Sequence, residues 1–218
     1  MTVNLITITS PRSPVSEAYR RLRTNLEFAR LDKPLRTLLV TSAGPDEGKS
    51  TTLANLAVSI AQAGRRVILV DSDLRHPQLH EIFDLDNQEG LTTFARQESE
   101  DISLRESGVN GLRLLTAGPL PGIPVDLIAS PGMEALIAAL RQQADIVLFD
   151  APPVVTVTDA AVLASKVDGV LLVVNAVRTR REYAQRAQAL LEKVHARLVG
   201  VVLTNVPHDT ALDEYYRK

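Results

Sequence analysis

One stretch of the chain, residues 38–52, constrains the fold more than any other. In it an apolar run leads through a turn-forming loop into the start of a helix. The segment Gly48-Lys49-Ser50 matches the end of the G-x-x-x-x-G-K-[ST] pattern. In that pattern backbone N–H groups hold phosphates, the lysine reaches the β and γ oxygens, and the hydroxyl ligates Mg²⁺. The stretch therefore predicts a phosphate-binding loop.

This loop departs from the pattern at its first glycine, which is Ala43 here. We therefore expect the loop to turn on Gly44-Pro45 instead. The alternative is an ordinary strand, turn and helix in which Gly-Lys-Ser occurs by chance. Phosphate binding requires a strand before the loop and a helix after it, and both are indicated here. We therefore predict a nucleotide site formed by Gly44, Pro45, Asp46, Glu47, Gly48, Lys49, Ser50 and Thr51.

Composition narrows the class of protein. The 218 residues, 45% of them hydrophobic, can form one domain with a sizeable core. A formal net charge of −2 gives no global attraction to nucleic acid or to an anionic membrane. The absence of cysteine excludes disulfides and thiolate metal sites, and no stretch resembles a signal peptide or an apolar membrane span. We expect a cytoplasmic protein without nucleic-acid binding or direct membrane insertion.

The order of apolar runs predicts the fold. Short, mostly continuous apolar runs alternate with helical patterns, which is typical of strands covered on both faces. We predict an α/β fold, a doubly wound and mostly parallel sheet with helices on both faces, of the P-loop NTPase type. Residues 119–131 are rich in proline and are expected to form a loop over the strand ends. The predicted strands are 67–70, 112–115, 146–149, 170–174 and 199–203, and the predicted helices are 51–63, 132–143, 158–166 and 179–196.

The pattern of the first thirty residues predicts an arm followed by a helix. Residues 3–9 are β-prone and precede two prolines, so we expect 1–13 to be an arm or an edge strand. Ser13 is a cap for a helix over 14–31 that begins with proline. Its polar face carries Glu17, Arg20 and Arg23, whose spacing of three places them close together. Spacing alone favours a solvated charged face.

Acidic residues follow two of the apolar runs. Asp71 and Asp73 come after residues 67–70, and Asp150 comes after 146–149. Ligands of open α/β sheets bind outside the carboxyl ends of the strands, so these acids should face the predicted phosphates. Capping of a following helix is the alternative for each. Carboxylates often hold Mg²⁺ through water while Ser50 and the phosphates ligate it directly, and a hydroxyl acceptor needs a base.

These residues carry a resemblance to a known family. The run 69–77, with Asp71-Ser72-Asp73 at its centre, resembles the D-x-D-x-R second Walker motif of bacterial tyrosine kinases, P-loop enzymes that regulate capsule and exopolysaccharide synthesis. Asp150-Ala151-Pro152-Pro153 is similar to the third motif, D-x-P-P, of that family, and 17–23 is similar to its E-x-x-R-x-x-R oligomerisation motif. The resemblance runs from about residue 12 to residue 206. It changes the expectation for the charged helix face from solvation to assembly.

The resemblance implies a role for each catalytic residue. Lys49 would contact the β- and γ-phosphates, and Ser50 would bind Mg²⁺. Asp73 and Asp150 would hold the ion through water, and Asp71 would be the candidate base. Acids two residues apart at a strand end can exchange duties, so the separate roles of Asp71 and Asp73 stay open.

Other positions follow the family less closely. Arg75 would orient Asp73 or reach phosphate, with an ordinary surface arginine as the alternative. Asn205 would lie near the adenine, where Thr204 replaces an asparagine of the family. The related partition and cell-division ATPases carry a second lysine at the position of Gly44, so its absence here favours the kinase branch.

The chain also differs from the family at its end. Bacterial tyrosine kinases carry a terminal tyrosine cluster for autophosphorylation, whereas the flexible tail predicted over 207–218 has Tyr215 and Tyr216 alone. A frayed terminus is the alternative for these two. Arg178, Arg180 and Arg181 surround Thr179 and could meet a phosphate or a neighbouring subunit, with an exposed arginine group as the alternative.

The sequence therefore predicts an autophosphorylating protein-tyrosine kinase that uses ATP and Mg²⁺. The expected partners are other copies in a ring, protein substrates with tyrosine, and the cytoplasmic segment of a membrane polysaccharide co-polymerase that acts as a separate activator and recruits the kinase to the inner face of the membrane. Two rival interpretations remain, a P-loop switch ATPase without kinase activity and a non-catalytic ATP-binding scaffold.

Overall fold

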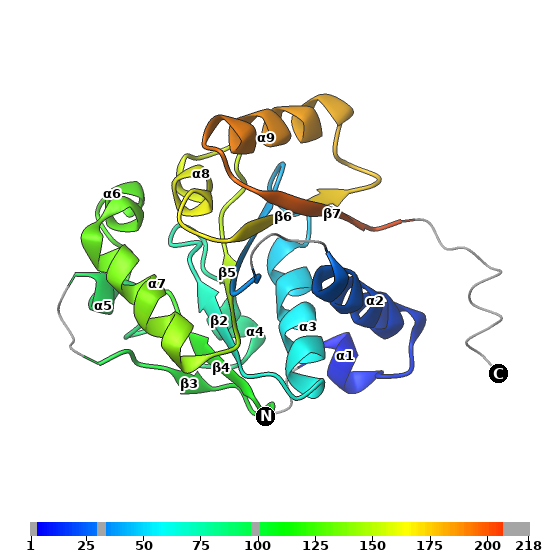
Figure 1. The fold of residues 1–218 in the computed structure, drawn as a ribbon, viewed down its shortest axis with the longest axis horizontal. Coiled ribbons are helices and arrows are strands. Elements are labelled where there is room, and N and C mark those ends of the chain that lie inside the picture. The colour runs from blue at the N-terminus through cyan, green and yellow to red at the C-terminus, as the bar shows by residue number, and fades with distance from the viewer. Residues whose placement is uncertain (1–3, 30–33, 97–100, 207–218) are drawn as a thin grey trace.

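In the part of the chain that the structure describes, a single sheet of seven strands organises the molecule, and helices lie on both of its faces (Figure 1). The computed structural model describes residues 4–29, 34–96 and 101–206. The strand order is β3-β4-β2-β5-β1-β6-β7, and β3 pairs antiparallel with β4 while the other pairs are parallel. The strands are β1 Thr37–Ser42, β2 Val67–Asp71, β3 Arg105–Glu106, β4 Leu112–Leu115, β5 Ile146–Asp150, β6 Gly169–Asn175 and β7 Leu198–Thr204.

The predicted strands are confirmed, although the edge strand β7 is only partly buried, with Val201 and Leu203 exposed. Every residue of β1, β2, β5 and β6 is buried, as expected for central parallel strands. The sequence did not indicate β3, which is two residues long and only partly buried. Such a short edge strand carries no apolar run to detect.

Two layers of helices cover the sheet. The helices α1 to α4 lie on one face and α5 to α9 on the other (Figure 1). Their bounds are α1 Ile6–Thr9, α2 Pro14–Phe28, α3 Lys49–Gln62, α4 Leu79–Ile82, α5 Leu91–Ala95, α6 Pro124–Ala129, α7 Pro131–Gln143, α8 Asp159–Ala164 and α9 Arg181–Lys193. The predicted doubly wound α/β fold is thereby confirmed.

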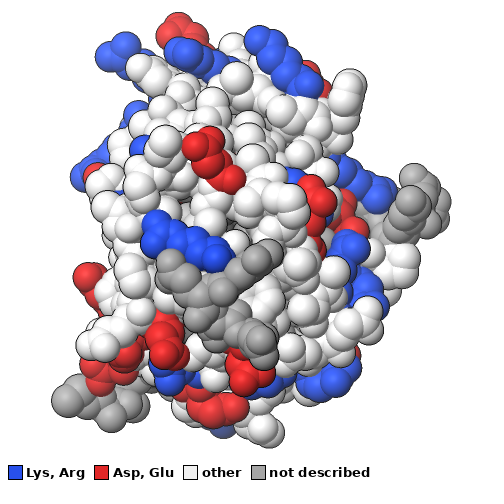
Figure 2. Space-filling view, turned by 90° about the vertical axis from the view of Figure 1, so that its left-hand side faces the viewer, with Lys and Arg blue, Asp and Glu red and all other residues white. Residues whose placement is uncertain are grey.

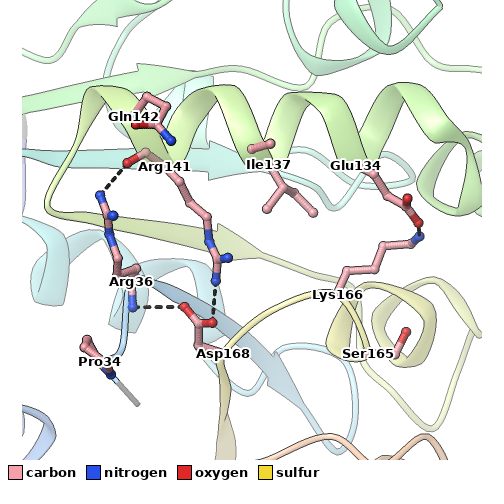
Figure 3. Close-up of a pocket in the computed structure, with 10 residues that line it drawn as sticks. Pro34, Arg36, Glu134, Ile137, Arg141, Gln142, Ser165, Lys166 and Asp168 are labelled. Carbon is pink, nitrogen blue, oxygen red and sulfur yellow. Dashed lines mark hydrogen bonds and ion pairs between the residues drawn. The ribbon is translucent and has the colours of Figure 1, made fainter.

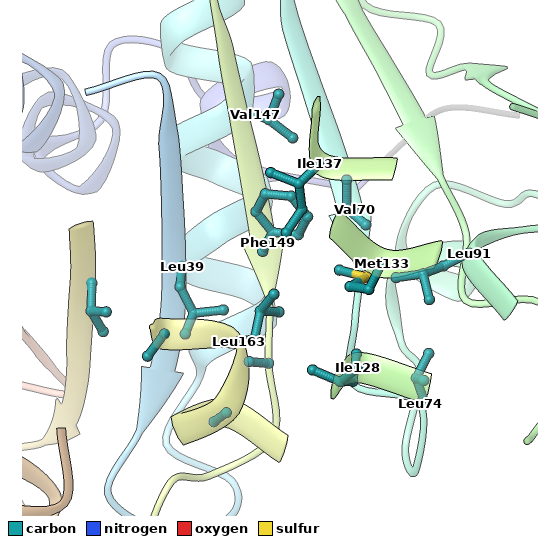
Figure 4. Packing of buried hydrophobic residues seen from close by; sticks show 14 of the residues in the cluster. Leu39, Val70, Leu74, Leu91, Ile128, Met133, Ile137, Val147, Phe149 and Leu163 are labelled. Carbon is teal, nitrogen blue, oxygen red and sulfur yellow. The ribbon is translucent and has the colours of Figure 1, made fainter. Parts of the chain in front are cut away.

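The core on the α7 face centres on one aromatic ring. Phe149 of β5 is fully buried and lies among Leu39, Met133 and Ile137, as Figure 4 shows. Strand side chains alternate between faces, so Phe149 points into this layer while Leu148 belongs to the opposite core with α3. This packing fixes the end of β5 and therefore the backbone of Asp150, the next residue.

The predicted arm or edge strand at the N-terminus is wrong. Ile6–Thr9 forms a helical turn despite its β-branched residues. The backbone N–H and the hydroxyl of Thr7 both donate to Asn55 Oδ1 of α3, at 3.1 and 2.9 Å, and Leu5 is buried beside them. These contacts outweigh the local β preference.

Prolines begin helices at two places. Ser13 caps α2 by accepting the N–H of Ser16 at 3.2 Å, which confirms the predicted start; this helix ends at Phe28, and residues 30–33 lie outside the described residues. Within the predicted loop 119–131, however, Pro124 begins α6 and Pro131 begins α7. Proline fits the first helical position because no hydrogen bond from its nitrogen is needed there.

Candidate active site

The loop between β1 and α3 has the shape of a phosphate cradle. Its turn is centred on Pro45 and Asp46 rather than on Gly44-Pro45, and Asp46 and Gly48 have left-handed φ angles of 56° and 82°. Gly44 is needed for a different reason, because a Cβ there would lie 3.3 Å from Glu47 Oε1. The loop then enters α3, whose fourteen residues direct a helix N-terminus toward the loop.

The predicted lysine and acids come together at the carboxyl edge of the sheet. Asp71 and Asp150 end the neighbouring strands β2 and β5 and are paired in register. Lys49 Nζ lies 2.9 Å from Asp73 Oδ2 and 3.5 Å from Asp150 Oδ1, and it donates to Ser50 Oγ at 3.1 Å. The structure therefore groups all five residues that the sequence assigned to phosphates, metal and base.

Buried charges at this edge are incompletely balanced. Asp150 is fully buried and its carboxylate oxygens have no hydrogen-bond partner among the described residues, apart from the ion pair with Lys49. Burial raises the pKa of Asp150 to about 6, although Lys49 opposes the shift. Burial alone would lower the pKa of Lys49, but Asp150 and Asp73 outweigh it and raise that pKa. The edge holds more negative charge than Lys49 neutralises.

The two carboxylate oxygens of Asp71 have different surroundings, one that suits a helix cap and one that suits a base. Its Oδ2 accepts the N–H groups of Gln78 at 3.0 Å and Leu79 at 2.9 Å, at the start of α4. Its Oδ1 is buried without a hydrogen-bond partner among the described residues. Burial and the charge of Asp150 raise the pKa of Asp71 well above its ordinary value. One oxygen therefore holds a helix end while the other is available.

Arg75 does not orient Asp73, contrary to one sequence expectation. Its Nη2 lies 3.2 Å from Asp159 Oδ2 at the start of α8, and Asp159 is buried. Asp73 Oδ1 instead accepts the N–H of His76 at 3.1 Å. Sequence reasoning missed Asp159 because an acid at a helix start is an ordinary cap by its pattern.

Two cavities flank the phosphate loop. The smaller, about 280 Å³, is lined by loop residues together with Lys49, Asp73 and Pro153. The larger, about 800 Å³, lies between α2 and β7 and is bordered by Gly48, Thr51 and Asn205. Asn205 therefore lies where a base attached to phosphates in the smaller cavity could reach it. None of residues 119–131 lines either cavity.

The predicted assembly residues form contacts within this chain. Glu17 Oε2 lies 2.7 Å from Arg20 Nε, and Arg20 Nη1 donates to the carbonyl of Pro11 at 2.8 Å. Arg23 Nη1 donates to the carbonyl of Ser59 in α3 at 2.9 Å. The other predicted functional segment, with Tyr215 and Tyr216, lies outside the described residues.

Hydroxyl groups that the sequence analysis did not single out hold the strand ends. Thr41 Oγ1 donates to the carbonyl of Pro152 at 2.7 Å, and Ser72 Oγ donates to the carbonyl of Asp150. Thr179 Oγ1 donates to Glu47 Oε1. The available signal for Thr41 is a small polar residue directly after the apolar run 38–40, whereas Thr179 lies beyond the end of β6 and carries no such signal. Among the residues the structure describes, no helix has the length and apolar character to span a membrane.

Comparison with known proteins identifies relatives across most of the chain. A family model described as the CobQ/CobB/MinD/ParA nucleotide binding domain matches residues 38–218. Tyrosine-protein kinase YwqD of Bacillus subtilis (strain 168) is 41% identical over 201 residues, which is 92% of this chain and 85% of that protein.

Solved structures agree with that similarity. The chimerical protein CapA2B2 superposes with a TM-score of 0.90 at 38% identity, covering 95% of this chain and 92% of the other. The kinase domain of Escherichia coli tyrosine kinase ETK gives a TM-score of 0.92 at 29% identity, covering 97% and 83%.

Proposed function

Since the chain belongs to the bacterial tyrosine-protein kinases, which are built on the CobQ/CobB/MinD/ParA nucleotide-binding domain, we propose that it transfers the γ-phosphoryl group of ATP to tyrosine. One observation carries the proposal. Lys49 lies between a phosphate loop and the buried carboxylates of Asp73 and Asp150, within 2.9 and 3.5 Å of their oxygens. Phosphoryl transfer needs this combination of a cation for the phosphates and acids for a metal.

The residues present fit Mg²⁺. Ser50, Asp73 and Asp150 would hold it, directly or through water, because both oxygens of Asp150 are buried without a hydrogen bond from a described residue. The ion would supply positive charge to the β- and γ-phosphate oxygens. It would also offset the excess negative charge of the edge.

Lys49 and the N-terminus of α3 would stabilise the transition state. Negative charge spreads over the equatorial oxygens of the transferred group, and an ammonium group with backbone N–H groups nearby stabilises it without reorganisation. Lys49 is held by Asp73 and Ser50, at 2.9 and 3.1 Å, so its position is set before substrate binds. This preorganisation supports a catalytic role over simple binding.

Asp71 would accept the phenolic proton. The bond between the β–γ bridging oxygen and the γ-phosphorus breaks, a bond from the tyrosine oxygen to that phosphorus forms, and the proton passes to Asp71 Oδ1. Two properties support this assignment, since Oδ1 has no hydrogen-bond partner among described residues and the pKa of the carboxyl is raised. Asp71→Asn should therefore reduce transfer to tyrosine more than it reduces nucleotide binding.

One assay separates the proposal from its rivals. Purified protein is incubated with labelled ATP and Mg²⁺, with and without the activating segment of a membrane partner, and phosphotyrosine and free phosphate are measured separately. A kinase produces phosphotyrosine, a switch ATPase releases phosphate alone, and a scaffold binds ATP without either product. Phosphate release without phosphotyrosine in both conditions would overturn the kinase proposal.

We further propose a cytoplasmic location at the inner face of the membrane. The partner would be a cytoplasmic segment of a membrane polysaccharide co-polymerase, and the system would regulate capsule or exopolysaccharide synthesis. The resemblance of residues 17–23, 69–77 and 150–153 to motifs of bacterial tyrosine kinases supports a partner of this kind. Adding such a segment should increase phosphotyrosine formation, whereas a scrambled segment of equal charge should not.

For assembly, we propose that α2 joins copies of the chain into a ring. Glu17 and Arg20 are partly exposed, at 38% and 35% of their side chains, so they can exchange their mutual pair for partners on a neighbour. Arg23 already bonds to Ser59 and should contribute less. Sedimentation should show that the triple alanine variant at Glu17, Arg20 and Arg23 shifts toward monomer. If wild type and variant are both monomeric at high concentration, the assembly proposal fails.

The tail, although outside the described residues, is proposed to carry the phosphate acceptors. Changing Tyr215 and Tyr216 to phenylalanine should remove most autophosphorylation and spare ATP hydrolysis. A Lys49→Met chain with its tail, mixed with an active chain lacking both tyrosines, should become phosphorylated if transfer occurs between subunits. Mass spectrometry that finds phosphate mainly on Tyr19 or Tyr183 would exclude the tail.

A further inference from the structure

We propose that the carboxylate of Glu47 positions the phosphate loop, by joining the start of the loop to Thr179 in the segment after β6. The proposal deepens the function above, because it concerns the same nucleotide site. It assigns a role to the acidic side chain of Glu47, which lies in a loop whose backbone and lysine are expected to bind phosphate. The motif does not require glutamate at this position.

The side chain of Glu47 is buried and fully engaged. The residue is 5% exposed, although it borders both cavities beside the loop. Its Oε2 accepts the N–H of Ala43 at 3.0 Å, and its Oε1 accepts the hydroxyl of Thr179. Its backbone carbonyl accepts the hydroxyl of Thr204 at 2.8 Å. A single residue therefore links the loop to the ends of both β6 and β7.

The loop departs from the usual pattern next to these bonds. Ala43 stands where the pattern has glycine, and its N–H is bonded to the Glu47 carboxylate. Glycine is instead at position 44, where a Cβ would lie 3.3 Å from Glu47 Oε1. The shift from position 43 to 44 makes room for the carboxylate. Both side-chain oxygens of Glu47 accept a hydrogen bond, so the side chain closes the loop from two directions.

Thr179, at the other end of the link, is itself held in place by hydrogen bonds. Thr179 Oγ1 also accepts the N–H of Asn175 at 3.1 Å, and the buried Asn175 accepts the N–H groups of Val177 and Arg178 at 3.0 and 3.1 Å. Glu47 is thus anchored to a closed turn rather than to a free side chain. The arginines at 178 and 180 flank Thr179, so the same link fixes their backbone relative to the phosphate loop.

The consequence concerns nucleotide affinity more than chemistry. A loop held open in its binding shape does not have to be ordered when phosphates arrive, so binding avoids that entropic cost. Once bound, phosphates themselves order the backbone. Removing the carboxylate should therefore weaken binding about tenfold, which corresponds to about 1.4 kcal/mol, and change kcat by less than about threefold.

The central test compares Glu47→Ala with Glu47→Gln. Glutamine keeps an acceptor for the Ala43 N–H and can donate to Thr179 Oγ1, so it should retain affinity within about threefold, whereas alanine should lose about tenfold. Binding of MgADP is measured by calorimetry, and KM and kcat follow with ATP. The calorimetric readout does not depend on phosphoryl transfer, so failure of the kinase proposal would be seen separately.

Matched controls are available on α9 and on Thr179 itself. Glu192 accepts from Gln188 on the exposed side of α9, so Glu192→Ala and Glu192→Gln should both bind MgADP normally. Thr179→Ser keeps the hydroxyl and should bind normally, whereas Thr179→Val should weaken binding. Adding Thr179→Val to Glu47→Ala should cause little further loss, because both remove the same link.

Three results would overturn the proposal. In the first, Glu47→Gln is as impaired as Glu47→Ala, which would assign the effect to charge. In the second, the losses from Glu47→Ala and Thr179→Val multiply, which would show that they act independently. In the third, the melting temperature falls while MgADP affinity stays normal in every variant, which would make the link structural only.

Discussion

The two edges of the sheet use aspartates and basic side chains in opposite ways. At the amino edge, Asp168 accepts the backbone N–H groups of Arg36 at 3.0 Å and Thr37 at 2.8 Å and the Thr37 hydroxyl at 2.9 Å. It also forms an ion pair with Arg141 of α7 (Figure 3). Burial opposes ionisation here, but Arg141 and Thr37 outweigh it and lower the pKa of Asp168.

At the carboxyl edge, burial of the aspartate outweighs the groups that favour its ionisation. Asp150 is fully buried, lacks a hydrogen bond from any described residue, and has a pKa raised to about 6. Both edges carry a cavity, one of about 740 Å³ beside Asp168 and one of about 280 Å³ beside Lys49. The amino edge, where the oxygens of Asp168 are hydrogen-bonded, contributes stability. The carboxyl edge, where those of Asp150 are not, keeps charge available for a metal and phosphates.

The face of the molecule formed by α5, α6 and α7 does not repeat either pattern. Figure 2 shows the face with α5, α6 and α7, where acidic and basic side chains are interspersed among uncharged ones. A mixed surface of this kind favours solubility over a single charged partner. On this face, therefore, the described residues form no cluster of charge of one sign that resembles the group of acids at the carboxyl edge.

The largest effect should come from Lys49→Met. Removing the cation leaves Asp73 and Asp150 unpaired and deprives the phosphates of a transition-state contact, so ATP turnover should fall by on the order of 10²–10³-fold with the fold retained. Lys166→Met is the control, because Lys166 pairs with the exposed Glu134 near the amino edge. Coupled assays and circular dichroism measure both. Wild-type turnover in Lys49→Met would remove the loop from the mechanism.

The sequence predicted the acids at the carboxyl edge better than it predicted contacts between side chains far apart in the chain. Continuous apolar runs indicate buried parallel strands, and acids that end such runs lie at one edge of the sheet, so Asp71 and Asp150 could be predicted. Pairing between distant side chains leaves no periodic signal. Neither the bond from Thr179 to Glu47 nor the ion pair of Arg75 with Asp159 could therefore be anticipated.

The second largest effect should appear at the amino edge. Asp168→Ala leaves the Thr37 N–H and hydroxyl without their acceptor, and Thr37 is fully buried, so the free energy of unfolding should fall by roughly 2–3 kcal/mol. KM for ATP should not change. Asp145→Ala, which breaks an exposed pair with Arg66, should cause a smaller loss. Urea unfolding measures both, and equal losses would contradict the comparison.

A smaller effect of opposite sign is expected for Asp150→Asn. The neutral amide removes a buried charge that Lys49 only partly balances, so without Mg²⁺ at pH 7 the free energy of unfolding should rise by roughly 1–2 kcal/mol. Activity should fall, and Mg²⁺ should no longer stabilise the protein. Thermal unfolding with and without Mg²⁺ tests this, and a variant less stable than wild type would reverse our interpretation of the carboxyl edge.

The smallest effect is the dependence of the free energy of unfolding on pH. Asp150 at the carboxyl edge and Asp168 at the amino edge should change it in different pH ranges. Asp150 has an unfolded pKa of 3.8 and a folded pKa of about 6, so between those values the folded state binds more protons. Stability should therefore rise as pH falls from about 7 to about 4, by less than about 1.4 kcal/mol per unit. Asp168 has a lowered folded pKa, so its contribution is complete above 3.8 and is lost as pH falls below that value.

Two variants separate these contributions. Asp150→Asn should reduce the rise in stability between pH 7 and 4 and leave the loss at lower pH, because its amide does not titrate; the rise that remains should come from Asp71, whose pKa is also raised. Asp168→Ala should keep the rise and weaken the acid loss, from a lower starting stability. Urea unfolding at each pH, without Mg²⁺, measures the slopes. An undiminished rise in Asp150→Asn would contradict the role of Asp150 and assign the proton uptake to Asp71 alone.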